Sequence, residues 1–128
     1  MLVNQLSVFM ENKEGRLEQV LETLKEGNIN INSLSLAETA DYGLLRMIVS
    51  DPEAGKNALK DKGFSAMLTP VLAVDVADEV GQLQVVLTKI TQAGINIEYI
   101  YSMKAGGDGA TIIIRTSDLD KTAEVLKV

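Results

Sequence analysis

The second half of the chain repeats the pattern of the first half at a constant distance of 66 residues. Subtracting that distance places Gly81 on Gly15 and the tripeptide Ile95–Ile97 on Ile29–Ile31. Seven of the 17 positions from Gly15 to Ile31 are identical in the two copies. Two copies of this length are too few and too long for a solenoid, so each copy is predicted to be a small domain.

The hydrophobic period changes in the same order in both copies. Alternating apolar residues predict a first strand in each, with these residues on one face: Leu6, Val8 and Met10, then Leu72, Val74 and Val76. A stripe at helical spacing follows, made of Leu17, Val20, Leu21 and Leu24 in one copy and Leu83, Val86, Leu87 and Ile90 in the other. Gly27 with Asn28, and Gly94, are expected to end these helices.

A hairpin is predicted after each of these helices. Its strands are expected at residues 31–37 and 42–50 in the first copy, and at 95–103 and 109–116 in the second. The turn-rich sequences ETAD and KAGGD join them.

A second helix follows each hairpin, at residues 50–63 and 117–127. The expected N-cap is Ser50 or Asp51 in the first and Ser117 or Asp118 in the second. FSAML, residues 64–68, then predicts a fourth strand in the first copy, and Pro70 is expected to separate that strand from the second copy.

The order strand, helix, strand, strand, helix, strand predicts an α+β fold of two ferredoxin-like (βαββαβ) domains, each an antiparallel sheet with its helices on one face. We expect the domains at residues 1–69 and 70–128. The second copy lacks its last strand, so either the sequence is a shortened one or another segment fills that edge. Arg115 aligns with Val49, whereas the arginine of the corresponding first-copy strand is Arg46, which falls on the opposite face of a strand from position 49. We therefore expect a one-residue shift or bulge in one copy.

Composition narrows the classes of function. The 128 residues carry 12 Lys and Arg against 18 Asp and Glu, and this net charge of -6 disfavours nucleic acid and membrane surfaces as partners. The chain has no His and no Cys, which removes thiol nucleophiles, imidazole bases and nearly every zinc, haem or iron–sulfur site. Most familiar catalytic constellations are therefore unavailable, and we expect no cofactor. No apolar run approaches bilayer length, and we expect a cytoplasmic protein.

The loop after each first strand is the first candidate site. It reads MENKEG before one helix and VADEVG before the other, and each ends in a glycine, Gly15 or Gly81. One interpretation is a tight turn and nothing more. The other is an anion site, because exposed backbone N–H groups and the helix dipole favour a carboxylate there.

Asn30 and Asn96 are the second candidate, because Asn is disfavoured at the start of a strand between two isoleucines. Either the amide bonds a nearby loop backbone, or it binds the carboxylate or ammonium of a small zwitterion. The glycine-rich AGGDGAT lacks the Gly-Lys-Ser/Thr ending of a phosphate loop and is predicted to be a turn. Tyr99 and Tyr101 share one strand face and are expected to cover an interface.

Together, the two xxNxxG or xxDxxG loops, the amphipathic helices and the doubled [IV]NI motif resemble ACT domains, and the chain is similar to a small tandem ACT protein. The resemblance covers both copies, from about Gln5 to Val128. It implies a regulatory, non-catalytic protein that binds an amino acid or similar ligand between paired domains. It also implies a homo-oligomer, a dimer, and a regulated enzyme or transcription factor as partner.

The same resemblance implies which residues bind the ligand. In ACT domains that regulate serine synthesis, the Asn of the first loop in one domain and the Asn of [IV]NI in its partner hold the ligand. Here the first pocket would join Asn12 to Asn96 and the second Asp78 to Asn30. Asp78 replaces the expected Asn, and an ionised carboxylate accepts but cannot donate, so we expect at most one well-formed site per pair. Met10 stands where serine-binding members often have His, so serine specificity is not implied.

Three alternatives use the same architecture. The first is an assembly module that uses the sheet edges and binds no small ligand. The second is an acyl-phosphate hydrolase with Arg16 and Asn12, but the Gly-rich, Arg-ended loop it needs is absent. The third is RNA binding, for which LLRMIVS and TIIIRT offer neither strand aromatics nor a basic face.

Overall fold

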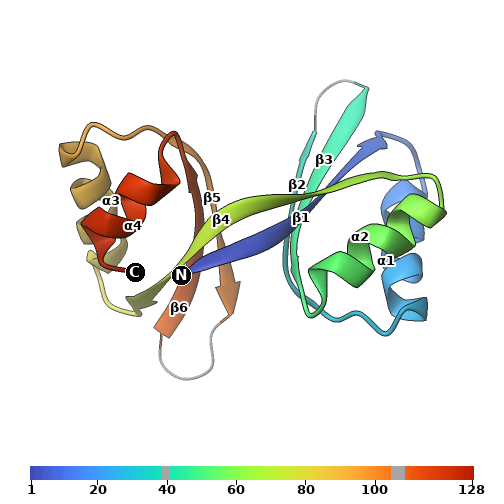
Figure 1. The fold of residues 1–128 in the computed structure, drawn as a ribbon, viewed down its shortest axis with the longest axis horizontal. Coiled ribbons are helices and arrows are strands. Elements are labelled where there is room, and N and C mark those ends of the chain that lie inside the picture. Colours follow the sequence, from blue (N-terminus) through green and yellow to red (C-terminus); the bar gives the residue numbers. More distant parts are fainter. Residues whose placement is uncertain (39–40, 105–108) are drawn as a thin grey trace. The chain divides into compact units, whose positions relative to one another are not determined.

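The computed structural model describes residues 1–38, 41–104 and 109–128. It divides into two compact units, and each contains antiparallel strands and two helices (Figure 1). The first unit is Asn4–Thr69, and the second combines Pro70–Val128 with Met1–Val3. The turns predicted at ETAD and KAGGD, and part of AGGDGAT, lie outside the described residues.

The first unit follows the predicted order of elements. They are β1 (Leu2–Glu11), α1 (Arg16–Glu26), β2 (Ile31–Glu38), β3 (Tyr42–Val49), α2 (Pro52–Asp61) and the beginning of β4 (Ser65–Ala77). The strands lie in the order β2-β3-β1-β4, and the register of β1 on β3 pairs Val8 with Leu45. The ferredoxin-like fold predicted from the sequence is confirmed.

The second unit repeats this arrangement with the end of β4. Its further elements are α3 (Gln82–Gln92), β5 (Ile97–Lys104), β6 (Gly109–Thr116) and α4 (Leu119–Leu126). The strand order is β5-β6-β4, and the N-terminal residues of β1 lie beside β4.

The missing fourth strand of the second unit comes from the other end of the sequence. The ammonium group of Met1 donates to the carbonyl oxygen of Ala73 at 2.9 Å, and the N–H of Ala73 donates to the carbonyl oxygen of Met1 at 2.8 Å. Of the two alternatives left open by the sequence, the structure supports the one in which another segment fills this edge, and the segment is Met1–Val3.

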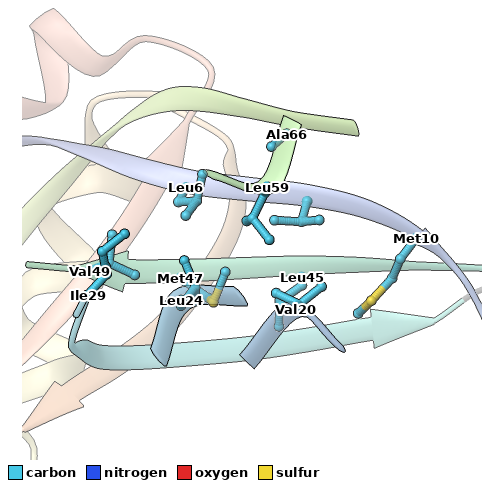
Figure 2. Close-up of a cluster of buried hydrophobic side chains, with 11 residues drawn as sticks. Leu6, Met10, Val20, Leu24, Ile29, Leu45, Met47, Val49, Leu59 and Ala66 are labelled. Atoms are coloured by element: carbon cyan, nitrogen blue, oxygen red, sulfur yellow. The ribbon is translucent and has the colours of Figure 1, made fainter. Parts of the chain in front are cut away.

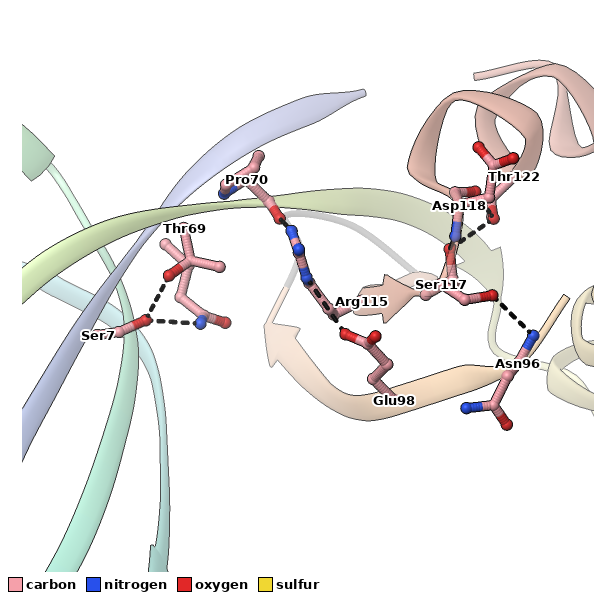
Figure 3. Close-up of polar contacts among 11 residues, drawn as sticks. Ser7, Thr69, Pro70, Asn96, Glu98, Arg115, Ser117, Asp118 and Thr122 are labelled. Atoms are coloured by element: carbon pink, nitrogen blue, oxygen red, sulfur yellow. Dashed lines mark hydrogen bonds and ion pairs between the residues drawn. The ribbon is translucent and has the colours of Figure 1, made fainter.

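The predicted break at Pro70 is wrong. β4 continues from Ser65 to Ala77 through the proline, because its fixed φ is compatible with an extended strand and only its missing N–H limits pairing. The carbonyl oxygen of Pro70 accepts a hydrogen bond from Nη1 of Arg115 at 2.6 Å (Figure 3).

Each unit has its own hydrophobic core between sheet and helices. The alternating face of β1 is buried as predicted, and it packs with Val20 and Leu24 of α1 and with Leu59 of α2 (Figure 2). Leu72, Val74 and Val76 of β4 occupy the equivalent place in the second unit. In the first unit α2 lies so close to β1 that a Cβ added at Gly55 would be 2.9 Å from Cδ2 of Leu6.

The position of Arg115 is explained by the second hairpin. Both β2 and β5 have a bulge after their first residue, between Ile31 and Ser33 and between Ile97 and Tyr99, so a bulge does not distinguish the copies. The hairpin that pairs Lys104 with Ala110 contains one more residue than the hairpin that pairs Glu38 with Gly43. The expected one-residue shift is therefore confirmed.

The second helix of each unit is capped by an aspartate. Oδ1 of Asp51 accepts from the N–H of Ala54 at 3.1 Å, and Oδ1 of Asp118 accepts from the N–H of Lys121 at 3.0 Å. Of the two residues predicted for each cap, the aspartate is the one that caps. No helix within the described ranges has the length and apolar character needed to cross a membrane.

Candidate ligand-binding site

The loop between the first strand and the first helix has the same geometry in both units. In the first unit the N–H of Lys13 donates to the carbonyl oxygen of Glu11 at 2.8 Å, and in the second the N–H of Glu79 donates to that of Ala77 at 2.9 Å. Gly15 has φ of 84° and Gly81 has φ of 85°, a left-handed conformation that favours glycine. Both glycines therefore form tight turns in the left-handed conformation.

The helices that follow these loops begin without a side-chain cap. At Gly15 and at Gly81 no side chain bonds the first N–H groups of α1 or α3, whereas α2 and α4 have aspartate caps. The N–H of Arg16 donates to the carbonyl oxygen of Lys13 and that of Gln82 to the carbonyl oxygen of Glu79, both at 3.2 Å. The positive end of the helix dipole and the following N–H groups, which no side chain caps, favour an anion. This contrast leaves the second interpretation of the loops, a carboxylate site, open in both units.

Asn12 lies in the first of these loops with an exposed side chain. Its backbone N–H donates to the carbonyl oxygen of Asp41 at 3.0 Å, and its Nδ2 donates to Oε2 of Glu38 at 3.2 Å. The equivalent Asp78 is also exposed. Since the contact of Asn12 with Glu38 is exposed to water, a ligand can replace it at little cost.

Asn30 and Asn96 lie beside the N-termini of α2 and α4. The N–H of Asn30 donates to Oγ of Ser50 at 2.9 Å, and the N–H of Ser50 donates back to the carbonyl oxygen of Asn30 at 2.9 Å. Asn96 and Ser117 form the same pair, with distances of 3.2 and 2.9 Å (Figure 3). The backbone at both Asn positions is thus fixed by a serine that precedes the helix cap.

The side chain of Asn30 bonds another side chain. Its Nδ2 donates to Oδ1 of Asn32 at 2.9 Å, and the residue is exposed beside a shallow depression of about 380 Å³ lined also by Lys25 and Asn28. Sequence reasoning named Ser50 and Ser117 only as possible caps and missed that they hold the Asn backbone. The sequence feature that indicates this role is the serine that directly precedes the capping aspartate in both copies.

The structure does not bring the loop residue and the strand Asn of one unit together. Asn12 precedes α1 and Asn30 follows it, and a helix of 11 residues is about 16 Å long at 1.5 Å per residue. Asp78 and Asn96 flank α3 in the same way. The loop residue and the strand Asn of one unit therefore do not share a pocket within that unit.

Charged side chains gather next to the loop of the first unit. Nζ of Lys13 lies 3.1 Å from Oε2 of Glu11, and Nη2 of Arg16 lies 3.4 Å from Oε1 of the same carboxylate. The hydrogen bond and charge of Lys13, followed by the charge of Arg16, lower the pKa of the Glu11 carboxyl below its usual range. Within the described part of the chain, no cluster of three or more His, Cys, Asp or Glu could hold a metal ion.

A pocket next to the same loop was missed by the sequence analysis. It has a volume of about 240 Å³ and lies entirely within the first unit. Its lining residues are Phe9, Met10, Glu11, Arg16, Tyr42, Gly63, Phe64 and Ser65. The available signal was Phe9, which stands at a position of the first strand where the alternation places an outward-facing residue.

The βαββαβ order, with Met1–Val3 in place of the last strand in the second unit, defines a tandem α+β protein of the ferredoxin-like type. Residues 1–128 match the family model of the ACT domain pair, and the chain belongs to this family. No curated protein matches the chain. The fold class and the resemblance drawn from the sequence are thus confirmed.

Solved structures agree with this assignment. Protein BT0572 from Bacteroides thetaiotaomicron is 46% identical, with a TM-score of 0.93 over 99% of this chain and 88% of that one. The regulatory subunit of aspartate kinase from Thermus thermophilus, in its ligand-free form, shares the fold at 16% identity, with a TM-score of 0.68 over 99% of this chain and 95% of that one. Aspartokinase alpha and beta subunits share it at 17% identity, with a TM-score of 0.61 over 98% and 93%.

Proposed function

We propose that this protein is a non-catalytic regulatory module that binds an amino acid at the interface between paired ACT domains. The observation that carries the proposal is the repeated glycine loop in front of α1 and α3, which have no side-chain cap, whereas α2 and α4 have aspartate caps. Backbone N–H groups there suit the carboxylate that all amino acids share. Membership in the ACT domain pair family supports the proposal, and the regulatory subunit of aspartate kinase from Thermus thermophilus shares the fold.

In this proposal each pocket combines the loop residue of one domain with the Asn at the start of the second strand of another domain. The amide of Asn12 with the amide of Asn96 forms the better pocket, because each amide both donates and accepts. Asp78 with Asn30 forms the weaker one, since an ionised carboxylate repels the ligand's carboxylate. Gly15 and Gly81 let the loop backbone turn toward the ligand. The protein acts in the cytoplasm, as a homodimer, on an enzyme or a transcription factor.

A thermal-shift screen of the proteinogenic amino acids tests the proposal. A ligand present at 100 times its dissociation constant stabilises the folded state by about 2.7 kcal/mol, so the cognate amino acid raises Tm measurably. Asn12→Ala and Asn96→Ala should each reduce that shift. Asn57→Ala is the matched control, because Asn57 is exposed on α2 away from the loops. If no amino acid raises Tm, or both pocket variants keep the full shift, the proposal fails.

An assembly module without a small ligand is the second candidate. It is favoured by the edge strand β2, where Leu34 and Leu36 are 49% and 47% exposed. An exposed strand edge with apolar side chains is a template for pairing with another chain. Light scattering with and without amino acids separates the candidates, since constant self-association with no ligand response favours assembly.

A further inference from the structure

The side-chain amides of Asn30 and Asn96 differ, although the two backbones are held alike. Nδ2 of Asn30 donates to Oδ1 of Asn32 at 2.9 Å. Among residues 1–38, 41–104 and 109–128, the structure gives the exposed side chain of Asn96 no hydrogen bond. The first amide is therefore already engaged, whereas the second is open to water.

The residue that bonds Asn30 lies in the bulge of β2. Glu98 has the equivalent place in the bulge of β5. Each bulge residue follows its Asn by two positions, so the same backbone geometry offers Glu98 an equivalent contact with Asn96. A carboxylate oxygen accepts a hydrogen bond more strongly than a neutral amide oxygen does. A free Glu98 side chain is therefore a better partner for Asn96 than Asn32 is for Asn30.

An arginine holds Glu98 in another direction. Nε of Arg115 lies 3.4 Å from Oε1 of Glu98, and Nη1 of Arg115 donates to the carbonyl oxygen of Pro70 at 2.6 Å. The guanidinium is thus bound from two sides, by β4 and by β5. Figure 3 shows the carboxylate of Glu98 directed toward Arg115, while the dashed line at Asn96 ends on its backbone nitrogen.

The two positions of this ion pair change together between the copies. Ile48 has the place of Arg115 in the first unit, since each is the residue paired directly after the bulge. Ile48 is apolar and buried, so it cannot hold a carboxylate. The bulge residue opposite it, Asn32, carries no charge. The pair of opposite charges is therefore a feature of the second unit, where it accompanies the open amide.

We propose that Arg115 is a positioning residue that keeps the amide of Asn96 available for a ligand by holding Glu98 away from it. In the first unit Asn32 occupies the amide of Asn30, and a ligand must displace that contact. This assignment of the two amides stands by itself. Its effect on affinity rests on the proposed function, in which Asn96 contacts an amino acid.

Release of Glu98 acts against binding in two ways. The carboxylate occupies the donor of the Asn96 amide, and its charge repels the carboxylate of an amino acid. The neutral Asn32 does only the first of these, and its exposed contact with Asn30 is replaced at little cost. Loss of Arg115 is therefore expected to weaken the second unit more than the Asn32 contact weakens the first.

Side-chain amide NMR of the full chain without ligand tests the assignment. A hydrogen-bonded Nδ2 proton resonates downfield of one that is exposed to water, so we expect a downfield signal for Asn30 and not for Asn96. Arg115→Gln should move the Asn96 signal downfield, because the released Glu98 accepts from it. Asn32→Ala should move the Asn30 signal upfield, because it removes the acceptor.

Further variants separate the release of Glu98 from damage to the strand, because Arg115 also bonds Pro70. Glu98→Ala added to Arg115→Gln should return the Asn96 signal to its original position, which a structural defect would not do. Arg115→Lys keeps the cation and should leave the signal in place. Lys89→Gln, on the exposed face of α3, is the matched charge control and should have no effect. An unmoved Asn96 signal in Arg115→Gln, or no return with Glu98→Ala, overturns the inference.

Glycine tests the effect on binding, because it has the carboxylate and ammonium of every amino acid and no side chain. In the native chain we expect the Asn96 signal to shift and saturate with glycine. Arg115→Gln should weaken this binding about tenfold, the low end for a competing hydrogen bond to a charged group. Equal affinity of the native and Arg115→Gln chains overturns the effect of Arg115 on binding.

Failure of this inference and failure of the proposed function give different results. If glycine shifts the Asn96 signal in no variant while Arg115→Gln moves it, the proposed function loses support and the assignment of the amides stands. If glycine shifts Asn96 while Arg115→Gln leaves both the signal and the affinity unchanged, the paired-domain site stands and the positioning by Arg115 is wrong.

Discussion

The charge state of Glu11 is set directly by two neighbouring cations, Lys13 and Arg16. Nζ of Lys13 contacts its carboxylate at 3.1 Å and lowers its pKa more than Arg16 does. Lys13→Met should therefore raise the pKa of Glu11 toward its usual range, as followed by NMR titration of the side-chain carboxyl carbon. Lys60→Met, on α2, is the control and should leave that pKa unchanged.

The ion pair of Lys13 and Glu11 also makes the stability of the folded state depend on pH. Since the pKa of Glu11 is lower in the folded than in the unfolded state, its contribution is present above the unfolded pKa and is lost as the pH falls through the folded pKa. Because the side chains of Glu11 and Lys13 are exposed to solvent, water and salt screen the pair. A pKa of Glu11 that does not respond to Lys13→Met would contradict this account.

Gly55 illustrates a constraint that only packing reveals. A Cβ at this position would lie 2.9 Å from Cδ2 of the fully buried Leu6, so Gly55→Ala forces the core to shift. The overpacking cost of about 1–3 kcal/mol exceeds the gain in helix propensity of about 1 kcal/mol, and we expect a net loss of about 1 kcal/mol in the free energy of unfolding. Urea unfolding measures it. Asn57→Ala, on the exposed face of α2, should gain a few tenths of a kcal/mol, and an equal gain for Gly55→Ala would refute the packing argument.

At the scale of elements, the N-terminal strand segment completes the second unit. Deletion of Met1–Val3 removes two backbone hydrogen bonds to Ala73, each worth about 0.5–1.5 kcal/mol net, so we expect a loss of about 1–3 kcal/mol. Hydrogen exchange at the amide of Ala73 should become fast. Leu2→Ser is the control, because Leu2 is 60% exposed and the backbone pairing remains. A protected Ala73 amide in the deletion variant would show that the segment is dispensable.

Local sequence patterns predicted the helices and most strands. The features that were undecided or missed depend on pairing between strands that are distant in the sequence. Apolar alternation at Leu6, Val8 and Met10 identified the buried face of β1, because the period of two follows directly from strand geometry. The filling of the open edge by Met1–Val3 was left undecided, since three residues carry no pattern of their own. The continuous β4 was missed, because a proline signals a break in sequence but is tolerated where no N–H is needed.

The candidate sites were predictable to different degrees. The glycine loops were found because the positive φ of Gly15 and Gly81 leaves a sequence signal twice. The pocket lined by Phe9 and Phe64 was not found, because its residues come from separate segments of the chain and meet only in the folded unit. The sequence repeat thus revealed the loops that both copies share, but it did not reveal the pocket of the first unit.

At the scale of the whole molecule, duplication has produced two copies with the same backbone and different site chemistry. The loops superimpose in their hydrogen bonds and in the φ of their glycines, yet one carries Asn12 and the other Asp78. In the proposed paired-domain site, this single difference decides whether the loop can donate to a ligand carboxylate. The two pockets of a pair are therefore expected to differ in affinity while they share a framework.

Asp78→Asn tests that expectation on the whole chain. The change replaces an acceptor-only carboxylate by an amide that also donates, and it removes a charge that repels the ligand's carboxylate. In calorimetric titration with the amino acid found by thermal shift, we expect the stoichiometry to rise from one paired-domain site per chain to two. The isosteric exchange Asp75→Asn, on β4 outside the loop, is the control for charge alone. If Asp78→Asn binds no additional ligand while Asn12→Ala still abolishes the first site, then the asymmetry of the two pockets does not reside in the loop residue.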